Sequence, residues 1–319
     1  MMFLDYILTS VAIGMTFLFG CTGEILTEKV GHLNLGIPGI MCIGGASGCL
    51  ALKFCYALGP GAVPIAIIAS FVGGALMGAI YSFLTVTLKA NQNVTGLAMT
   101  TFGVGVTNYI MSGMAIGAHK NYLYALQFFR NPLSSFIPYQ LNGLKYWGVM
   151  MLLAIGIALG AAYILGRTRV GLHLRAVGES PATADAAGIN VTAYKYGATC
   201  IGSGIAALGG LYYIMDFMGS VEAYKTIEAL GWLSVALVIF TLWRPQISII
   251  GSIIFGMLYL AGTRIPTLLG INLDMSATPL LQMLPYVVTI IVLIITSIGK
   301  KRENQPPASL GLPYFREER

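Results

Sequence analysis

Long apolar runs, separated by short polar segments, follow one another along the whole chain. A helix that crosses a bilayer needs about 20 mostly apolar residues, and nine runs reach or approach that length. They lie at 3–22, 33–52, 62–88, 94–118, 147–166, 196–215, 229–243, 246–262 and 280–298. The pattern predicts an all-α polytopic membrane protein with about nine transmembrane helices, within a range of eight to ten.

Two of the runs are short and lie close together. Little more than Arg244 and Pro245 separates 229–243 from 246–262, which predicts either a tight helical hairpin or one broken helix. We expect a single transmembrane domain over 1–298. Residues 299–319 form a polar, proline-containing cytoplasmic tail that we expect to be irregular and not required for the fold.

Composition narrows the function classes. The chain has 319 residues, of which 56% are hydrophobic and 9% charged, and its mean hydropathy is +0.79. Soluble domains carry about 25% charged residues, so the composition excludes soluble enzymes and nucleic-acid-binding modules. We expect the chain to be surrounded by the lipid bilayer. Glycine is enriched at 40 residues. Small residues four apart predict close helix packing at Gly44/Gly48, Gly74/Gly78 and Gly156/Gly160.

The net charge of +6 indicates how the chain is oriented in the membrane and does not imply a nucleic-acid partner. Cytoplasmic loops of membrane proteins hold the excess of Lys and Arg, and placing the C-terminus in the cytoplasm puts twelve of the eighteen basic residues inside. These are Lys29, Lys89, Arg167, Arg169, Arg175, Lys195, Arg244, Lys300, Lys301, Arg302, Arg316 and Arg319. With nine spans, the N-terminus then lies outside.

No charged residue falls within a span as drawn, although Asp5 lies near one end. Ion-coupled carriers usually place ionisable groups at membrane depth, whereas a transporter driven by an external motor does not need them. The pattern favours a motor-driven transporter of a neutral cargo. A motor-independent secondary transporter or channel for a small neutral solute stays open as the alternative.

The longest interior connection, 167–195, contains the signals of a short helix. Ser180 is a candidate N-cap, Pro181 suits the first helical position, and Gly188 suits the residue after the C-terminus. Two interpretations fit: a capped surface turn that joins two spans, or a coupling helix that lies along the membrane and contacts a separate ATPase subunit.

Polar residues interrupt two of the apolar runs. Asn34, Gly36, Pro38 and Gly39 interrupt the second run near its cytoplasmic start, which indicates either a break that lines a translocation pathway or a turn at the start of a helix with Gly39 used for packing. In the fourth run, a polar series falls broadly on one helix face. It consists of Asn93, Thr100, Thr101 and Asn108.

Two roles fit the polar series, and of these a structural role within the helix bundle is favoured over contact with cargo. Hydroxyl and amide groups suit a sugar or nucleoside cargo, but threonines also bond to their own helix backbone.

Motifs for catalysis and metal binding are missing. No G-x-x-x-x-G-K-[ST] segment occurs, the three histidines fall in different loops, and the five cysteines contain no C-x-x-C pair. We therefore expect a non-catalytic chain with no metal and no cofactor of its own.

Three segments together carry a family resemblance. The segment GLHLRAVGESPATADAAGI at 171–189, with GEILTEKVGHLNLGIPGIM at 23–41 and NQNVTGLAMTTFGVG at 91–105, resembles the permease subunits of bacterial ABC importers. The resemblance is to the group that serves branched-chain amino acids, ribose, other simple sugars and nucleosides. It is closest to the shorter permease of nucleoside or simple-sugar systems.

That resemblance implies a location in the bacterial cell membrane and a set of partners. These are an ABC ATPase subunit, a second homologous permease or a second copy of this chain, and a substrate-binding lipoprotein. It implies that Glu179, Ser180, Pro181, Asp185 and Gly188 contact the ATPase. The candidate pathway residues come from the polar pattern itself and are Asn34, Asn93, Thr100, Thr101 and Asn108. Two residues depart from the family pattern, since Pro38 replaces a usual Glu and Ser180 a usual Asn, which leaves the cargo open.

Overall fold

The protein is helical throughout its described part. The computed structural model describes residues 2–116, 148–269, 281, 283–298 and 305–315, and within these ranges it contains helices and turns but no strand. The α-helices are α1 (Met2–Glu28), α2 (Ile37–Cys55), α3 (Ala62–Ser82), α4 (Gln92–Ile116), α6 (Val149–Arg167), α7 (Arg169–Glu179), α8 (Pro181–Ala186), α9 (Val191–Tyr212), α10 (Ile227–Phe240), α11 (Pro245–Leu269) and α13 (Leu284–Ile298). Short 3₁₀ and π segments extend four of these helices, at Tyr56–Gly61, Phe83–Thr87, Tyr213–Met218 and Val221–Thr226.

Seven helices of the described residues are long and apolar enough to cross a membrane. They are Phe3–Glu28, Ile37–Gly59, Ala62–Thr87, Val149–Arg167, Val191–Met218, Val221–Phe240 and Pro245–Gly262, and a shorter apolar helix covers Leu284–Ile295. Helix α4 corresponds to the remaining predicted run. The predicted polytopic all-α fold is confirmed, and nine stands as an approximate number of spans.

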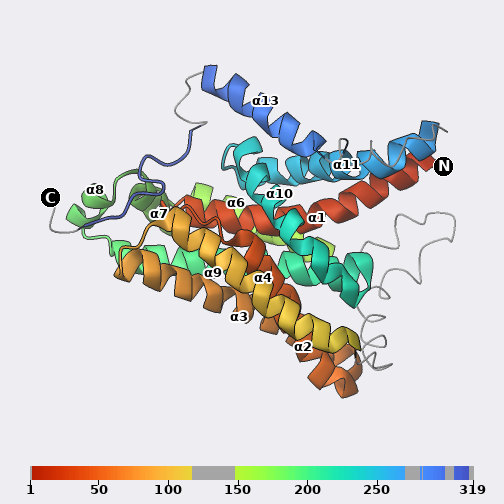
Figure 1. Ribbon diagram of the computed structural model, residues 1–319. Helices are drawn as coiled ribbons and strands as arrows, with labels where there is room; N and C mark the ends of the chain where they lie inside the picture. The colour runs from red at the N-terminus through yellow and green to blue at the C-terminus, as the bar shows by residue number, and fades with distance from the viewer. Residues whose placement is uncertain (1, 117–147, 270–280, 282, 299–304, 316–319) are drawn as a thin grey trace.

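Described segments that carry basic residues predicted to be cytoplasmic lie together at one end of the structure. Helices α7 and α8 lie with the C-terminus at one end of the molecule, and the N-terminus of α1 lies at the other (Figure 1). Three other predicted interior loops reach the same end, because Lys29 packs against Gly178, Lys89 binds Tyr314 and Trp243 binds Glu28. We call this end, formed by residues 29–36, 88–91, 168–190, 241–244 and 305–315, the α7–α8 end.

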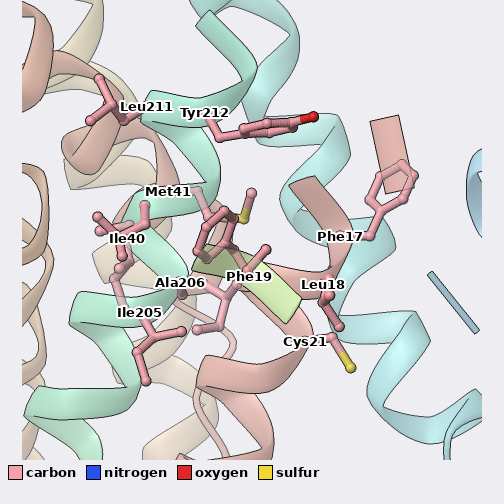
Figure 2. Close-up of a cluster of buried hydrophobic side chains, with 14 of the residues drawn as sticks. Phe17, Leu18, Phe19, Cys21, Ile40, Met41, Ile205, Ala206, Leu211 and Tyr212 are labelled. Atoms are coloured by element: carbon pink, nitrogen blue, oxygen red, sulfur yellow. The ribbon is translucent and has the colours of Figure 1, made fainter. Parts of the chain in front are cut away.

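Helix α9 lies at the centre of the fold. Within the span Val191–Met218, 89% of the residues in its most apolar stretch are buried. The helix packs against α1, α2 and α3. Figure 2 shows this contact, with Phe19 of α1, Met41 of α2 and Ala206 of α9 pointing toward one another. The hydroxyl of Tyr212 also donates to the main-chain oxygen of Ala12 at 2.8 Å, which ties α9 to α1.

The predicted glycine contacts are confirmed for two of the three pairs. A side chain at Gly48 would meet Leu211 at 2.6 Å, and one at Gly78 would meet the main-chain oxygen of Thr199 at 2.8 Å. Gly44 and Gly74 lie equally close to α9. For the third pair, Gly156 and Gly160, no described atom lies within 4 Å of either added Cβ, so its packing stays a prediction.

The expectation that the spans carry no charge is wrong. Helix α1 does not end at residue 22 but continues to Glu28, because the apolar helical spacing continues through Ile25 and Leu26, both buried. Glu24 and Glu28 therefore lie buried within a helix of membrane length. Two further buried charged residues lie in the continuous helix over 191–218, which begins before and ends after the predicted run: Lys195 and Asp216.

The short runs at 229–243 and 246–262 form a helical hairpin rather than one broken helix. Helices α10 and α11 are joined by the four residues 241–244, and Gly251 of α11 packs back on Thr241, whose Cγ2 would lie 2.7 Å from a Cβ at that glycine. Leu242 and Trp243 hold left-handed backbone angles, with φ of 54° and 56°. Such angles cost about 1 kcal/mol or more for residues with a Cβ, so the turn is held by its surroundings.

Candidate coupling site

The interior connection is more helical than the sequence predicted. Between α6 and α9 it contains α7 as well as the expected short helix α8. Thr168 caps α7 by accepting a hydrogen bond from the Gly171 amide at 3.2 Å. The buried side of α7 is formed by Gly171, Leu174, Val177 and Gly178, which is the spacing of an amphipathic helix.

The predicted capping of α8 is confirmed in its geometry. The Ser180 hydroxyl accepts a hydrogen bond from the Thr183 amide at 3.3 Å, and Pro181 occupies the first turn. Gly188 follows the helix with φ of +82°, and its amide donates to the Asp185 carbonyl at 3.0 Å. A left-handed glycine after the last turn is a usual helix terminator, so local sequence determines where α8 begins and ends.

Helix α8 presents one face outward. Ala184 is buried, and Pro181 and Asp185 are half-buried, whereas the outward-facing residues are exposed. The exposed residues are Ala182, Thr183, Ala186, Ala187 and Gly188. The face therefore consists of small side chains and is available to a second surface, and exposed Glu179 lies beside it at the end of α7.

Asp185 is oriented toward the C-terminal segment. Its Oδ2 accepts a hydrogen bond from the Tyr314 hydroxyl at 2.9 Å. Glu179 acts electrostatically on the α1–α2 turn: burial lowers the pKa of the Lys29 ammonium group, and the nearby Glu179 carboxylate opposes that shift. The two acidic residues of this connection thus link it to two other parts of the chain.

The end of the tail is packed against the α7–α8 end. Residues 305–315, which we call the C-terminal strap, contain a turn at 308–311. The main-chain nitrogen and the hydroxyl of Ser309 both donate to the Gly178 carbonyl, at 3.0 and 2.5 Å. Lys89 Nζ donates to the Tyr314 carbonyl at 2.7 Å. The strap is irregular, as expected, but it forms part of the folded body rather than lying outside it.

A buried polar cluster lies where α1 meets the turn that precedes α2. The main-chain nitrogen of Asn34 donates to Glu24 Oε1 at 3.1 Å, and the Asn34 side-chain oxygen accepts from the Gly36 amide at 2.9 Å. The indole N–H of Trp243 donates to Glu28 Oε2. The two carboxyl groups therefore hold the turns before α2 and before α11.

His32 fixes the same turn to α9. Its Nδ1 lies 2.8 Å from the Thr199 hydroxyl, and its ring meets the edge of Tyr81 with a centroid distance of 5.8 Å. Burial lowers the pKa of His32 well below its usual value, and the positive charges of Lys195 and Lys89 lower it further.

The five predicted pathway residues fall into two groups. Asn34 and Thr100 are both buried where the turn before α2 meets α4. The Thr100 hydroxyl donates to the Leu35 carbonyl of that turn at 2.8 Å. The other three are exposed on α4: Asn93, Thr101 and Asn108. Thr101 also bonds to its own helix at the Leu97 carbonyl, at 2.7 Å.

The second run is interrupted by a turn at the start of a helix. Helix α2 begins at Ile37 with Pro38 in its first turn. A Cβ at Gly39 would lie 2.5 Å from the Met99 carbonyl oxygen of α4. This matches the interpretation in which Gly39 serves packing, and it brings the start of α2 against the polar series of α4.

Within the described residues, no group of three or more His, Cys, Asp and Glu side chains is gathered where it would hold a metal ion. The five cysteines are free thiols, and Cys21, Cys42 and Cys49 are buried. The chemistry offered by this end of the molecule is therefore recognition and mechanical contact through helix faces, hydrogen bonds and charges.

Comparison with known families gives this geometry its context. Residues 3–295 match the family described as "Branched-chain amino acid transport system / permease component". The chain belongs to this permease family. It is thus a multi-pass membrane protein and a translocation subunit of ABC-importer type, and members of the family are non-catalytic membrane components. No solved structure matches the permease at a significant level.

Three curated relatives illustrate the family. The nucleoside ABC transporter permease protein NupC of Lactococcus lactis is 32% identical over 86% of this chain and 87% of its own. The guanosine ABC transporter permease protein NupQ of Bacillus subtilis is 29% identical over 93% of this chain and 92% of its own. A putative glucose ABC transporter permease protein of Haloferax volcanii is 32% identical over 74% and 70%. The resemblance stated from the sequence motifs is confirmed.

Several residues of the site were not anticipated from the sequence. Glu24 and Glu28 lie four residues apart on α1, and the continuing apolar spacing of Ile25 would have placed them on a helix. The left-handed angle of Trp243, and its contact with Glu28, have no signal in the local sequence. The strap residues Ser309 and Tyr314 lie in a proline-containing polar tail, a composition typical of unpacked segments.

Proposed function

We propose that the permease forms half of the translocation pathway of an importer for a nucleoside, and that α7 and α8 transmit the movement of a separate ABC ATPase. The observation that carries the coupling role is the exposed small-residue face of α8, beside Glu179 at the end of α7. A short, capped helix outside the membrane spans offers a rigid surface for a partner subunit. Glu179, Ser180, Pro181, Asp185 and Gly188 are the proposed coupling residues.

The nucleoside cargo is supported by the relatives. NupC and NupQ are named for nucleoside and guanosine transport, and both align over most of their length with this chain. A simple sugar is the second candidate, since another relative is named as a putative glucose permease. Both cargo classes present several hydroxyl groups and suit uncharged hydrogen-bonding side chains.

The proposed pathway surface is the exposed polar side of α4. Asn93, Thr101 and Asn108 are exposed on this helix, and polar groups at membrane depth are costly unless they face protein or a water-filled path. Thr100 and Asn34 would support this surface from behind, because both are buried at the α2–α4 contact. A second homologous permease, or a second copy of this chain, would complete the path.

The proposed orientation places the α7–α8 end in the cytoplasm of a bacterial cell. Seven basic residues of the described part lie at or beside this end, namely Lys29, Lys89, Arg167, Arg169, Arg175, Lys195 and Arg244. ATP would be bound by the partner ATPase, so no cofactor is assigned to this chain. A substrate-binding lipoprotein would deliver cargo at the opposite face.

The first test is co-purification. The permease is tagged at its N-terminus, because the strap is packed at the other terminus, and is purified gently from native membranes. We expect mass spectrometry to recover an ABC ATPase and a second permease. A stable chain that purifies with neither partner contradicts the proposed assembly.

The second test concerns the coupling residues. The double variant Glu179→Ala/Asp185→Ala is expected to lose ATP-driven uptake of guanosine in proteoliposomes, and to lose the stimulation of ATPase activity by cargo. The matched control removes two exposed carboxylates near the other end, Glu222→Ala/Glu228→Ala, and should keep the ATPase bound. Uptake and stimulated ATPase activity that survive in the first variant would refute the coupling role. Parallel uptake of glucose distinguishes the two cargo classes.

A further inference from the structure

The C-terminal strap connects elements that are distant in the sequence. Through Ser309 it is bound to the end of α7, since both donors of that residue point at the Gly178 carbonyl. Through the Tyr314 hydroxyl it is bound to Asp185 of α8. The strap therefore contacts both helices of the proposed coupling element.

The other side of the strap reaches the start of α4. Gln92, the first residue of α4, uses both ends of its amide: Nε2 donates to the Leu312 carbonyl at 3.4 Å, and Oε1 accepts from the Leu33 amide at 2.8 Å. Lys89, just before α4, donates to the Tyr314 carbonyl and lies 5.9 Å from the centre of the Phe315 ring. The strap thus joins the helix that carries the proposed pathway residues.

A third contact reaches the turn before α2. The Gly311 amide donates to the Gly31 carbonyl at 3.2 Å. Gly31 has φ of +87°, and a Cβ there would lie 2.7 Å from the Ser309 hydroxyl. This turn also contains Asn34, whose neighbour Leu35 is bound by Thr100 of α4, so the strap spans the space between the coupling helices and both elements of the proposed pathway.

We propose that the C-terminal strap is a positioning element of the transport cycle, which transmits displacement of α7 and α8 to the start of α4 and the turn before α2. The inference rests on the proposed coupling role of α7 and α8. Within the strap, Tyr314 is the residue through which the two sides meet, because its hydroxyl binds Asp185 while its carbonyl binds Lys89. Breaking its hydroxyl contact should leave the ATPase bound but loosen the link to α4.

The test uses Tyr314→Phe in the purified complex with its ATPase, reconstituted in proteoliposomes. The substitution removes the hydroxyl alone and keeps the ring and the main-chain carbonyl. One net hydrogen bond shifts an equilibrium between two states by about five-fold, so we expect guanosine uptake per ATP hydrolysed to fall by about that factor while the ATPase still co-purifies. The matched control is Tyr196→Phe, which removes a hydroxyl contact of 2.6 Å with Thr87 that involves no strap residue and should leave the ratio unchanged.

A second measurement separates positioning from stabilisation of the fold. If the strap transmits displacement through Asp185, adding Tyr314→Phe to Asp185→Ala should lower the ratio no further than Asp185→Ala alone. Ser309→Ala, which keeps the main-chain bond to Gly178, should give a smaller fall than Tyr314→Phe.

The outcomes that overturn the inference are distinct. A ratio of uptake to hydrolysis that matches wild type in Tyr314→Phe, with or without a lower melting temperature, shows a merely structural strap and leaves the proposed function standing. Additive losses in the double variant refute transmission through Asp185. A wild-type chain that binds no ATPase refutes the proposed function itself, and the inference with it.

Discussion

The indole N–H of Trp243 donates a hydrogen bond to the carboxyl group of Glu28, across 215 positions of the chain. The contact closes the α10–α11 turn onto the end of α1, and it explains how Leu242 and Trp243 hold left-handed backbone angles. Both side chains are buried. A buried acceptor deprived of its donor costs about 1–3 kcal/mol.

Trp243→Phe is therefore expected to destabilise the permease by at least that amount, since the ring is also smaller. A loss of 1 kcal/mol shifts the melting temperature of a large domain by about 2 °C, so a fall of several degrees is expected in detergent-solubilised protein. Trp232→Phe is the control, because Trp232 is half-buried and makes no hydrogen bond found among the described residues. Equal shifts in both variants would argue against a specific role for the Glu28 contact.

Close packing of α9 on α2 gives a second prediction. A Cβ at Gly210 would collide with the Met41 carbonyl oxygen, and backbone atoms on both sides leave little room to move. Overpacking of this kind typically costs about 1–3 kcal/mol, so Gly210→Ala should lower the melting temperature by several degrees.

Gly156→Ala provides the matched control within another helix. No described atom lies within 4 Å of its added Cβ, and replacing a helical glycine by alanine stabilises by about 0.5–1 kcal/mol. We expect this variant to match or exceed wild type. A stability loss there would indicate that the exposed side of α6 packs on something outside the described chain.

Local signals in the sequence were sufficient for the number and type of the long helices, at approximate bounds, and for the ends of α8. The roles of Ser180, Pro181 and Gly188 follow from capping chemistry within a few residues, and the structure reproduces each of them. Apolar residues at helical spacing also mark α7. This helix was not predicted, because residues 167–195 were treated as one loop with a single short helix. Elements whose geometry depends on near neighbours are thus accessible from one sequence.

Contacts between distant residues were not accessible. The length of α1 depends on burial of Glu24 and Glu28 by distant partners such as Asn34 and Trp243. Without knowledge of those partners, a carboxyl group after an apolar run predicts the start of a loop. The strap presents the same problem, because Tyr314 and Ser309 stand in a polar segment whose packing surface is assembled from α7, α8 and α4.

The buried imidazole of His32 predicts a loss of stability in acid. Its pKa is held well below the usual value by burial and by Lys195 and Lys89, whereas in the unfolded chain it titrates near about 6.5. Above that pH both states hold a neutral ring and no penalty arises. Below it the unfolded state takes up a proton and the folded state does not, so stability falls by up to about 1.4 kcal/mol per pH unit.

The check is the unfolding midpoint measured from pH 7.5 to 5.5 in wild type and in His32→Gln. Glutamine retains a hydrogen-bonding group near Thr199 but does not titrate, so the variant should be less stable at pH 7.5 and should show a flatter decline toward pH 5.5. Parallel curves would assign the acid sensitivity to other groups.

The exposed polar side of α4 supplies the last prediction. Asn108→Leu removes an amide that we place on the pathway, without disturbing packing, because the side chain is exposed. If one hydrogen bond to a nucleoside is lost, worth about 0.5–1.5 kcal/mol, the guanosine concentration for half-maximal uptake should rise by about two- to ten-fold while the melting temperature stays constant. Val94→Leu, an exposed apolar exchange on the same helix, should leave uptake unchanged. An unaltered uptake curve for Asn108→Leu, together with a reduced one for Val94→Leu, would move the pathway away from this polar series and toward the apolar face beside it.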